Sequence, residues 1–131
     1  MRSRQQFPPA LLVALTLAAL LGTSPASHAA GDPKRGADTF AQQCAICHST
    51  QEGRNKLGPS LFGVVDRKAG SVADYAYSAA MRQSEFTWSP EKIDAYIADP
   101  QQVVPGDKMR YHGLADAQDR ADVIAYLKTL H

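Results

Sequence analysis

The residues with the most distinctive chemistry form one short stretch, Cys44-Ala45-Ile46-Cys47-His48. Two thiols at this spacing at a helix end can each bond one of two vinyl groups on the same flat ring. The adjacent His48 then lies beneath the ring, where its imidazole can ligate a central metal. The pattern Cys-x-x-Cys-His is the attachment signature of c-type haem.

Three other chemistries use the same residue types. A disulfide between Cys44 and Cys47 suits an exported protein but gives His48 no role. A thioredoxin-like redox pair needs a strand–helix–strand context, and no strand pattern precedes the motif. A zinc site needs four ligands, and His112 and His131 are the only other histidines after residue 29. Haem attachment uses all three side chains of the motif, and we favour it.

The ligand on the other side of the iron decides between electron transfer and ligand chemistry. A six-coordinate haem mostly carries electrons, and His plus Met ligation raises its reduction potential. Met109 lies in a loop with Pro and Gly, where it has no helix to pack on, and we expect it to reach inward. His112 is a rival in the same loop. Met81 lies in an Ala-rich helical stretch and is expected to pack in the core.

The first 29 residues have the order of a secretory signal. Basic residues without acids come first, and the apolar run ALLVALTLAALL and small residues up to Ala29 follow. The alternative is an uncleaved membrane anchor, but a span needs about 20 apolar residues. A mitochondrial presequence should be amphipathic, whereas this run is apolar all round. We expect a cleaved signal peptide over 1–29, export to the periplasm and one domain over 30–131.

The remaining residues offer little material for a core. The chain has 131 residues, with 14 Lys+Arg against 13 Asp+Glu. Without the leader, 12 Lys and Arg face 13 Asp and Glu, and 15 of the 43 apolar residues are Ala. The even charge excludes a nucleic-acid binder that works by bulk electrostatics, and two Cys are too few for a disulfide-stapled miniprotein. A buried ligand would compensate for the thin core.

Helix signals position the motif, while strand signals are nearly absent. Asp32-Pro33 is an N-cap followed by a helical Pro, and helical spacing continues to about Cys44. The same signal at Ser89-Pro90 predicts a helix that Asp99-Pro100 stops, because Pro disfavours the α region before it. A last helix starts near Asp116. Its apolar stripe consists of Val123, Ile124, Leu127 and Leu130.

A short helical piece is expected near 77–83, and two long irregular stretches cover 49–73 and 100–114. Loops this long in a compact domain need a reason, which is usually function. A large ligand for these loops to wrap would supply that reason.

These motifs, in this order, resemble class I cytochrome c, close to the mitochondrial branch and its bacterial periplasmic relatives. The resemblance covers nearly all of 30–131. Besides the Cys motif it rests on Gly58-Pro59-Ser60-Leu61, Gly63, Arg67-Lys68-Ala69-Gly70, Tyr77-Ser78, Thr87-Trp88, Ile93-Asp94-Ala95-Tyr96-Ile97 with Asp99-Pro100, Val104-Pro105-Gly106-Asp107-Lys108-Met109 and Asp122-Val123-Ile124-Ala125-Tyr126-Leu127-Lys128.

The resemblance implies an all-α cytochrome c fold, with three to five helices wrapped around one covalently bound haem c. It implies Cys44 and Cys47 as thioether anchors and His48 and Met109 as axial ligands. By resemblance, the carbonyl of Pro59 should accept the ring N–H of His48. Other matched positions are Arg67, Tyr77 and Trp88 at a haem propionate, Tyr96 near the Met sulfur, and Gly36 and Phe40 against Tyr126 where the first and last helices meet.

Three residues depart from the family pattern and should alter hydrogen bonding and potential. Met81 stands where Asn is frequent, Asp107 where Thr is common, and Tyr111 where Phe is common.

The expected function is a monomeric, periplasmic one-electron carrier rather than an enzyme, with redox proteins as donor and acceptor and neither nucleic acid nor a small-molecule substrate as partner. Basic residues at the haem-covering loops (Arg54, Lys56, Lys108 and Arg110) would meet an acidic patch on the partner. Acids concentrate on the last helix, at Asp116, Asp119 and Asp122. A dedicated electron-transfer subunit of a dehydrogenase or reductase complex is an alternative, and haem catalysis or gas binding is another, which requires an open iron site.

Overall fold

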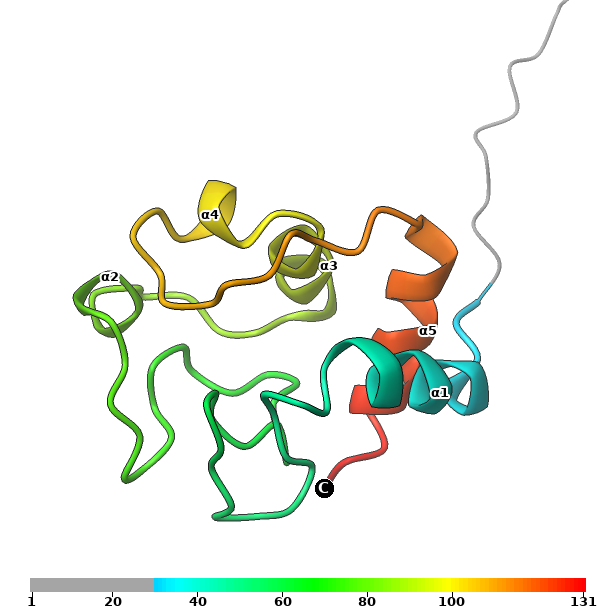
Figure 1. Ribbon diagram of the computed structural model, residues 1–131, viewed down its shortest axis with the longest axis horizontal. Helices are drawn as coiled ribbons and strands as arrows, with labels where there is room; N and C mark the ends of the chain where they lie inside the picture. Colours follow the sequence, from blue (N-terminus) through cyan, green and yellow to red (C-terminus); the bar gives the residue numbers. More distant parts are fainter. Residues whose placement is uncertain (1–29) are drawn as a thin grey trace, which may run out of the picture.

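The computed structural model describes residues 30–131, and the expected signal segment, 1–29, lies outside them. The helices are α1 (Pro33–Gln43), α2 (Ala79–Arg82), α3 (Pro90–Ala98), α4 (Pro100–Val103) and α5 (Ala117–Leu127). The described residues contain no strand, only one isolated bridge between Lys68 and Thr87. Helices α1 and α5 pack together on one side, and the loops and α2–α4 surround the middle (Figure 1). The all-α class expected from the sequence is confirmed.

The predicted helix starts are confirmed by their caps. The side chain of Asp32 accepts from the backbone N–H groups of the first turn of α1. Ser89 accepts from the N–H of Lys92 at the start of α3, and Asp116 from that of Asp119 at the start of α5. Each cap satisfies a donor that the helix itself leaves without a partner.

Two helix boundaries differ from the sequence expectation. Asp99-Pro100 does end α3, but it also begins α4, which the sequence analysis did not predict. Asp99 is extended, and its side chain accepts from the N–H of Gln102 at 3.2 Å, so the cap-then-Pro signal operates here as well. Helix α5 ends at Leu127, so Leu130 packs against the core from beyond the helix rather than on its stripe.

The contact of α1 with α5 depends on Gly36. A Cβ on Gly36 would lie 1.9 Å from the backbone oxygen of Asp122, far inside van der Waals distance. The rings of Phe40 and Tyr126 pack beside this crossing with centroids 5.5 Å apart. The contact expected from the resemblance is confirmed, because only glycine allows the two backbones so close.

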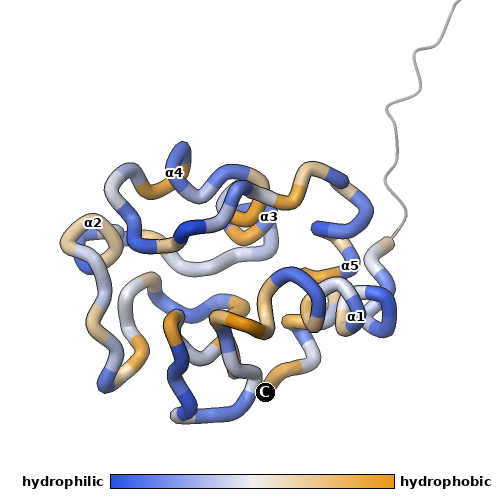
Figure 2. Tube along the Cα trace, viewed as in Figure 1, coloured by the Kyte–Doolittle hydropathy of each residue, from blue (hydrophilic) through white to orange (hydrophobic). Residues whose placement is uncertain are grey.

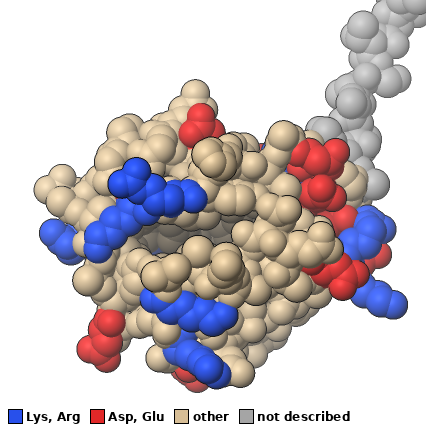
Figure 3. Space-filling view, viewed as in Figure 1, with Lys and Arg blue, Asp and Glu red and all other residues tan. Residues whose placement is uncertain are grey.

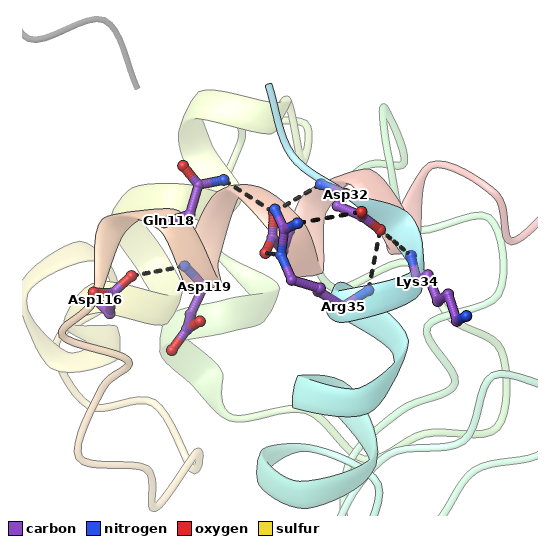
Figure 4. A network of polar contacts seen from close by, with 7 residues as sticks. Asp32, Lys34, Arg35, Asp116, Gln118 and Asp119 are labelled. Atoms are coloured by element: carbon purple, nitrogen blue, oxygen red, sulfur yellow. Dashed lines mark hydrogen bonds and ion pairs between the residues drawn. The ribbon is translucent and has the colours of Figure 1, made fainter. Parts of the chain in front are cut away.

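A polar network crosses the same interface (Figure 4). Arg35 donates to the carboxylate of Asp122 through Nε at 2.7 Å and Nη2 at 3.0 Å. The backbone N–H of Asp32 and the amide of Gln118 donate to the same carboxylate at 2.7 and 3.0 Å. Asp122 is 1% exposed, so its assignment to an acidic surface of the last helix was wrong. Sequence spacing does not separate a paired, buried acid from a solvated one.

The interior of the described residues is one apolar cluster, to which α1, α2, α3 and α5 all contribute buried side chains. Figure 2 shows an apolar stretch within α3 and long polar stretches in the outer loops. None of the helices in the described part of the chain is long and apolar enough to span a membrane.

The Arg35–Asp122 contact should make stability depend on acid. Hydrogen bonding to Arg35 lowers the pKa of Asp122 from 3.8 to about 2. A depressed carboxylate pKa stabilises the fold above the unfolded value, and this contribution disappears as the pH falls from about 4 to 2. We expect Asp122→Asn to lower the free energy of unfolding at pH 7 by about 1–3 kcal/mol. The difference from wild type should close over that acid range in denaturant titrations of the haem-loaded protein.

The matched control is Asp38→Asn, which removes the same charge at an exposed position of α1. A difference between wild type and Asp122→Asn that stays constant down to pH 2 would contradict the assignment.

Candidate functional site

A cavity of about 480 Å³ occupies the middle of the molecule. Its wall contains all four residues that the sequence analysis proposed for the cofactor, Cys44, Cys47, His48 and Met109. Side chains from four helices complete it, and they include Phe40 of α1, Met81 of α2, Ile93 and Tyr96 of α3, and Val123 and Leu127 of α5. In the space-filling view the hollow opens on one face (Figure 3). The thin core is explained, because the apolar side chains line this space instead of filling it.

The Cys motif follows directly from the end of α1. Cys44 is the C-cap of the helix, and its N–H donates to the carbonyl of Phe40. The N–H groups of Cys47 and His48 then both donate to the carbonyl of Cys44, at 3.1 and 2.9 Å, which curls the motif into a tight turn. Both thiols are free. Burial raises the pKa of Cys44 to about 11, so this thiol is neutral in the bare polypeptide.

His48 is held in one tautomer. Its Nδ1 lies 2.8 Å from the carbonyl oxygen of Pro59. A carbonyl only accepts, so Nδ1 carries the hydrogen and Nε2 keeps its lone pair for a metal. Burial, the dominant effect, lowers the pKa of His48 and favours the neutral, ligating form. The bond to Pro59 expected from the resemblance is confirmed.

The backbone at Gly58 lies against the ring of His48. A Cβ on Gly58 would be 2.4 Å from Cε1 and 2.7 Å from Nδ1 of that ring. Glycine therefore lets residues 58–59 close over the imidazole and fix its orientation, as supporting residues do around ligating histidines.

The three candidates for the second axial ligand differ in their position relative to the cavity. Met109 is half-buried and lines the cavity, whereas His112 is exposed and is not among the described residues of the cavity wall. Met81 is 4% exposed and packs in the core as expected, although it also reaches the cavity wall.

The hydrogen bonds of Arg67 indicate whether a haem would fit the cavity. Its Nη1 and Nη2 donate to the carbonyls of Phe62 and Ser60 at 2.7 and 3.0 Å. Its Nε is buried and is the one such side-chain atom in the described residues without a hydrogen-bond partner. Burial lowers the pKa of Arg67, so the charge is held here at a cost. A cation with an orphan donor in this wall fits an anionic edge, and the propionates of haem supply one.

The aromatic side chains named from the resemblance lie together around the cavity. Trp88 contacts Phe86 and Tyr96, with centroids 4.8 and 4.7 Å away, and Tyr77 contacts Tyr75 at 4.7 Å. Tyr77, Trp88 and Tyr96 all line the cavity. The hydroxyl of Tyr96 donates to the carboxylate of Asp107, so the residue that replaces the usual Thr is bonded directly to this wall.

Some cavity-wall residues had no expected role from the sequence, and Ile46, Leu57 and Tyr75 are among them. Ile46 and Leu57 are 80% and 79% exposed, the only large apolar side chains so exposed in the described part of the chain. Tyr75 donates its hydroxyl to the carbonyl of Leu57 at 2.7 Å and closes the loop beside them. The sequence feature that could have indicated a wall residue here is an apolar side chain, Leu57, between Lys56 and the Gly58-Pro59 pair.

Comparisons with known proteins identify the family of this chain. The family model described as cytochrome c matches residues 33–131. A cytochrome c2 of Rhodopila globiformis is 50% identical over 100 residues, which cover 76% of this chain and 94% of that protein. A cytochrome c2 of Rhodomicrobium vannielii is 45% identical over 123 residues, 93% and 97% of the two chains. The solved structure of cytochrome cH from Methylobacterium extorquens superposes with a TM-score of 0.71 at 42% identity, and covers 76% of this chain and 99% of that one.

The chain therefore belongs to the cytochrome c family, and its fold is the cytochrome c fold. It is a class I c-type cytochrome that carries one covalent haem c, for which Cys44 and Cys47 provide the attachment motif. It acts in electron transport, as a monohaem carrier.

Gly58 offers a test of how the motif is supported. We expect Gly58→Ala to displace the ring of His48, because the added methyl group overlaps it. The fraction of purified chain that carries covalent haem, measured by intact mass, should fall several-fold. Leu57→Ala is the matched control, since it changes the neighbouring, exposed side chain. Equal haem content in both variants would contradict this role of Gly58.

Proposed function

We propose that the protein is a periplasmic, soluble one-electron carrier whose haem iron is held by His48 and Met109. Residues 1–29 would be the cleaved export signal and residues 30–131 the cytochrome domain. The single observation that carries the proposal is that His48 and Met109, 61 positions apart in the sequence, line the same cavity as both Cys residues.

The leader sequence supports export. Its basic start, apolar run and small residues before Ala30 have the order of a secretory signal. The cytochrome c2 of Rhodomicrobium vannielii aligns over 93% of this chain, so the similarity extends into the leader. Export also places the two thiols where c-type haem is attached.

The chain's own residues would supply three conditions for electron transfer. When bound, haem provides a one-electron couple at its iron. Pro59 holds the imidazole of His48, and the loop between α4 and α5 supplies the side chain of Met109. The apolar wall excludes water, which limits reorganisation when charge changes. Two retained protein ligands leave no open position for a substrate, which favours a carrier over an enzyme.

Basic side chains frame the mouth of the cavity. Lys108 and Arg110 belong to its wall, and Lys56 bonds the carbonyl of Ala45 within the Cys motif at 2.6 Å. Figure 3 shows Lys and Arg on two sides of the hollow and acidic side chains gathered over α1 and α5. This dipole would orient an acidic redox partner toward the haem edge.

The exposed apolar surface at the mouth is small, since Ile46 and Leu57 are its two large members. A permanent subunit interface would need a much larger apolar area. Two such side chains within a basic rim suit brief contacts, and this supports a monomeric, free carrier over a dedicated subunit.

Replacement of Met109 tests the ligand set. We expect the oxidised wild type to show the sulfur-to-iron charge-transfer band in its far-red absorption, and Met109→Leu to lose it while haem stays covalently attached. Met81→Leu, a change in the same wall, should keep the band. A wild type without the band, or one that keeps it in Met109→Leu, would overturn the proposed ligation.

The basic mouth can be tested with small inorganic redox reagents. We expect Lys56→Gln with Lys108→Gln to slow oxidation of the reduced protein by ferricyanide, an anion, at least about twofold at low salt. The salt dependence should weaken as well, because less charge is screened. Lys34→Gln, on the exposed side of α1, is the control. If both variants react alike, the basic mouth does not steer partners.

A further inference from the structure

One side-chain contact in the cavity wall joins α3 to the loop that carries Met109. Tyr96 is 9% exposed, and its hydroxyl donates to Oδ2 of Asp107. Both residues line the cavity, and Asp107 lies two positions before Met109. Tyr96 and Met109 line the same cavity, and Met109 packs against the apolar cluster that contains Tyr96.

The loop is built so that Asp107 stays in place. Gln101 of α4 accepts from the N–H of Gly106 through Oε1 at 3.2 Å and donates through Nε2 to the carbonyl of Asp107, also at 3.2 Å. The N–H of Asp107 donates to the carbonyl of Val104 at 3.0 Å. Gly106 has a φ of 86°, a conformation that favours glycine. These hydrogen bonds hold the backbone of residues 104–107 in place, and the Asp107 side chain remains available to accept from Tyr96.

Asp107 is not engaged by a cation. Within residues 30–131, the ion pairs are Arg35–Asp32, Arg35–Asp122 and Arg120–Asp94. The neighbouring Lys108 donates instead to the carbonyl of Ala76. The carboxylate of Asp107 therefore remains a strong acceptor for the phenol.

The contact determines where the only hydroxyl hydrogen of Tyr96 goes. A phenol has one hydrogen to donate, and here it is committed to Asp107. Burial first, and then the hydrogen bond to Asp107, raise the pKa of Tyr96, so the phenol keeps that hydrogen. No second donor remains on this side chain for another acceptor in the cavity.

We propose that Asp107 is a positioning residue, which holds the hydroxyl hydrogen of Tyr96 away from the sulfur of Met109 and thereby lowers the reduction potential. The proposal rests on ligation by Met109. A hydrogen bond to a ligating sulfur withdraws electron density that the oxidised iron needs more than the reduced iron does. A sulfur without that bond therefore favours the oxidised state, in line with the effect of hydrogen bonds around metal ligands.

Two substitutions at Asp107 separate the hydrogen bond from the charge. Asp107→Asn removes the charge and keeps an oxygen that accepts from Tyr96. Asp107→Ala removes both, and so releases the phenol to the sulfur. At one applied potential, we expect the ratio of reduced to oxidised haem-loaded protein to be about threefold or more higher in Asp107→Ala than in Asp107→Asn. In a Tyr96→Phe background the two variants should be equal.

Tyr96→Phe alone provides a second test that needs no change in the loop. If the phenol gives no hydrogen to Met109, its removal should leave the ratio within about twofold of wild type. A clear fall in that ratio, or equal ratios in Asp107→Ala and Asp107→Asn when Tyr96 is present, would overturn the proposal.

The sulfur-to-iron band distinguishes this failure from failure of the proposed ligand set. Potentials are compared only among proteins that show the band. A wild type without it would reject ligation by Met109 itself, whereas a wild type and variants that all show it, with no difference between Ala and Asn at position 107, would reject only the role of Asp107.

Discussion

The structure depends on one constraint: its middle is reserved for a group that the polypeptide does not supply. The wall of the cavity draws side chains from α1, α2, α3 and α5 and from the loops between them. Most of the buried apolar side chains line this space, so helices and loops are positioned mainly by what they present to it. At the crossing of α1 and α5, the backbones themselves pack in direct contact at Gly36. That crossing supplies a rigid edge from which the Cys motif extends.

The same constraint explains the long irregular stretches. A loop that follows a flat, rigid group has to change direction often, and it does so at residues with left-handed backbone. Asp66 and Asp74 have φ values of 62° and 57°, in addition to the glycines of this region. Asp tolerates this conformation better than most residues do. A glycine in the sequence indicates that such a turn can form, whereas Asp also occurs at helix caps and on surfaces. The turns at Asp66 and Asp74 could therefore not be predicted from the sequence alone.

The features that were predictable are those fixed by local chemistry. Asp32-Pro33 and Ser89-Pro90 each combine a cap with a helical Pro, and both helices start where these signals stand. The Cys motif is likewise local, since its spacing brings the thiols and the imidazole together within one turn. Features that depend on tertiary contacts were not predicted correctly from the sequence. Asp122 is buried because Arg35 arrives from another helix, and α4 begins where Pro100 was interpreted only as a stop.

Asp107 lies between these two cases. Its identity was visible in the sequence as a departure from the family pattern, but its effect was not, because the direction of a hydrogen bond depends on the partner that the fold provides. The partner is Tyr96 of α3, which lies eleven positions before Asp107 and has a single hydroxyl hydrogen to donate. A Thr at the same place could both donate and accept, whereas an ionised carboxylate can only accept. With Asp instead of Thr at position 107, the hydrogen bond between the two side chains can run only from Tyr96 to residue 107. This restriction applies on the side of the cavity where Met109 lies.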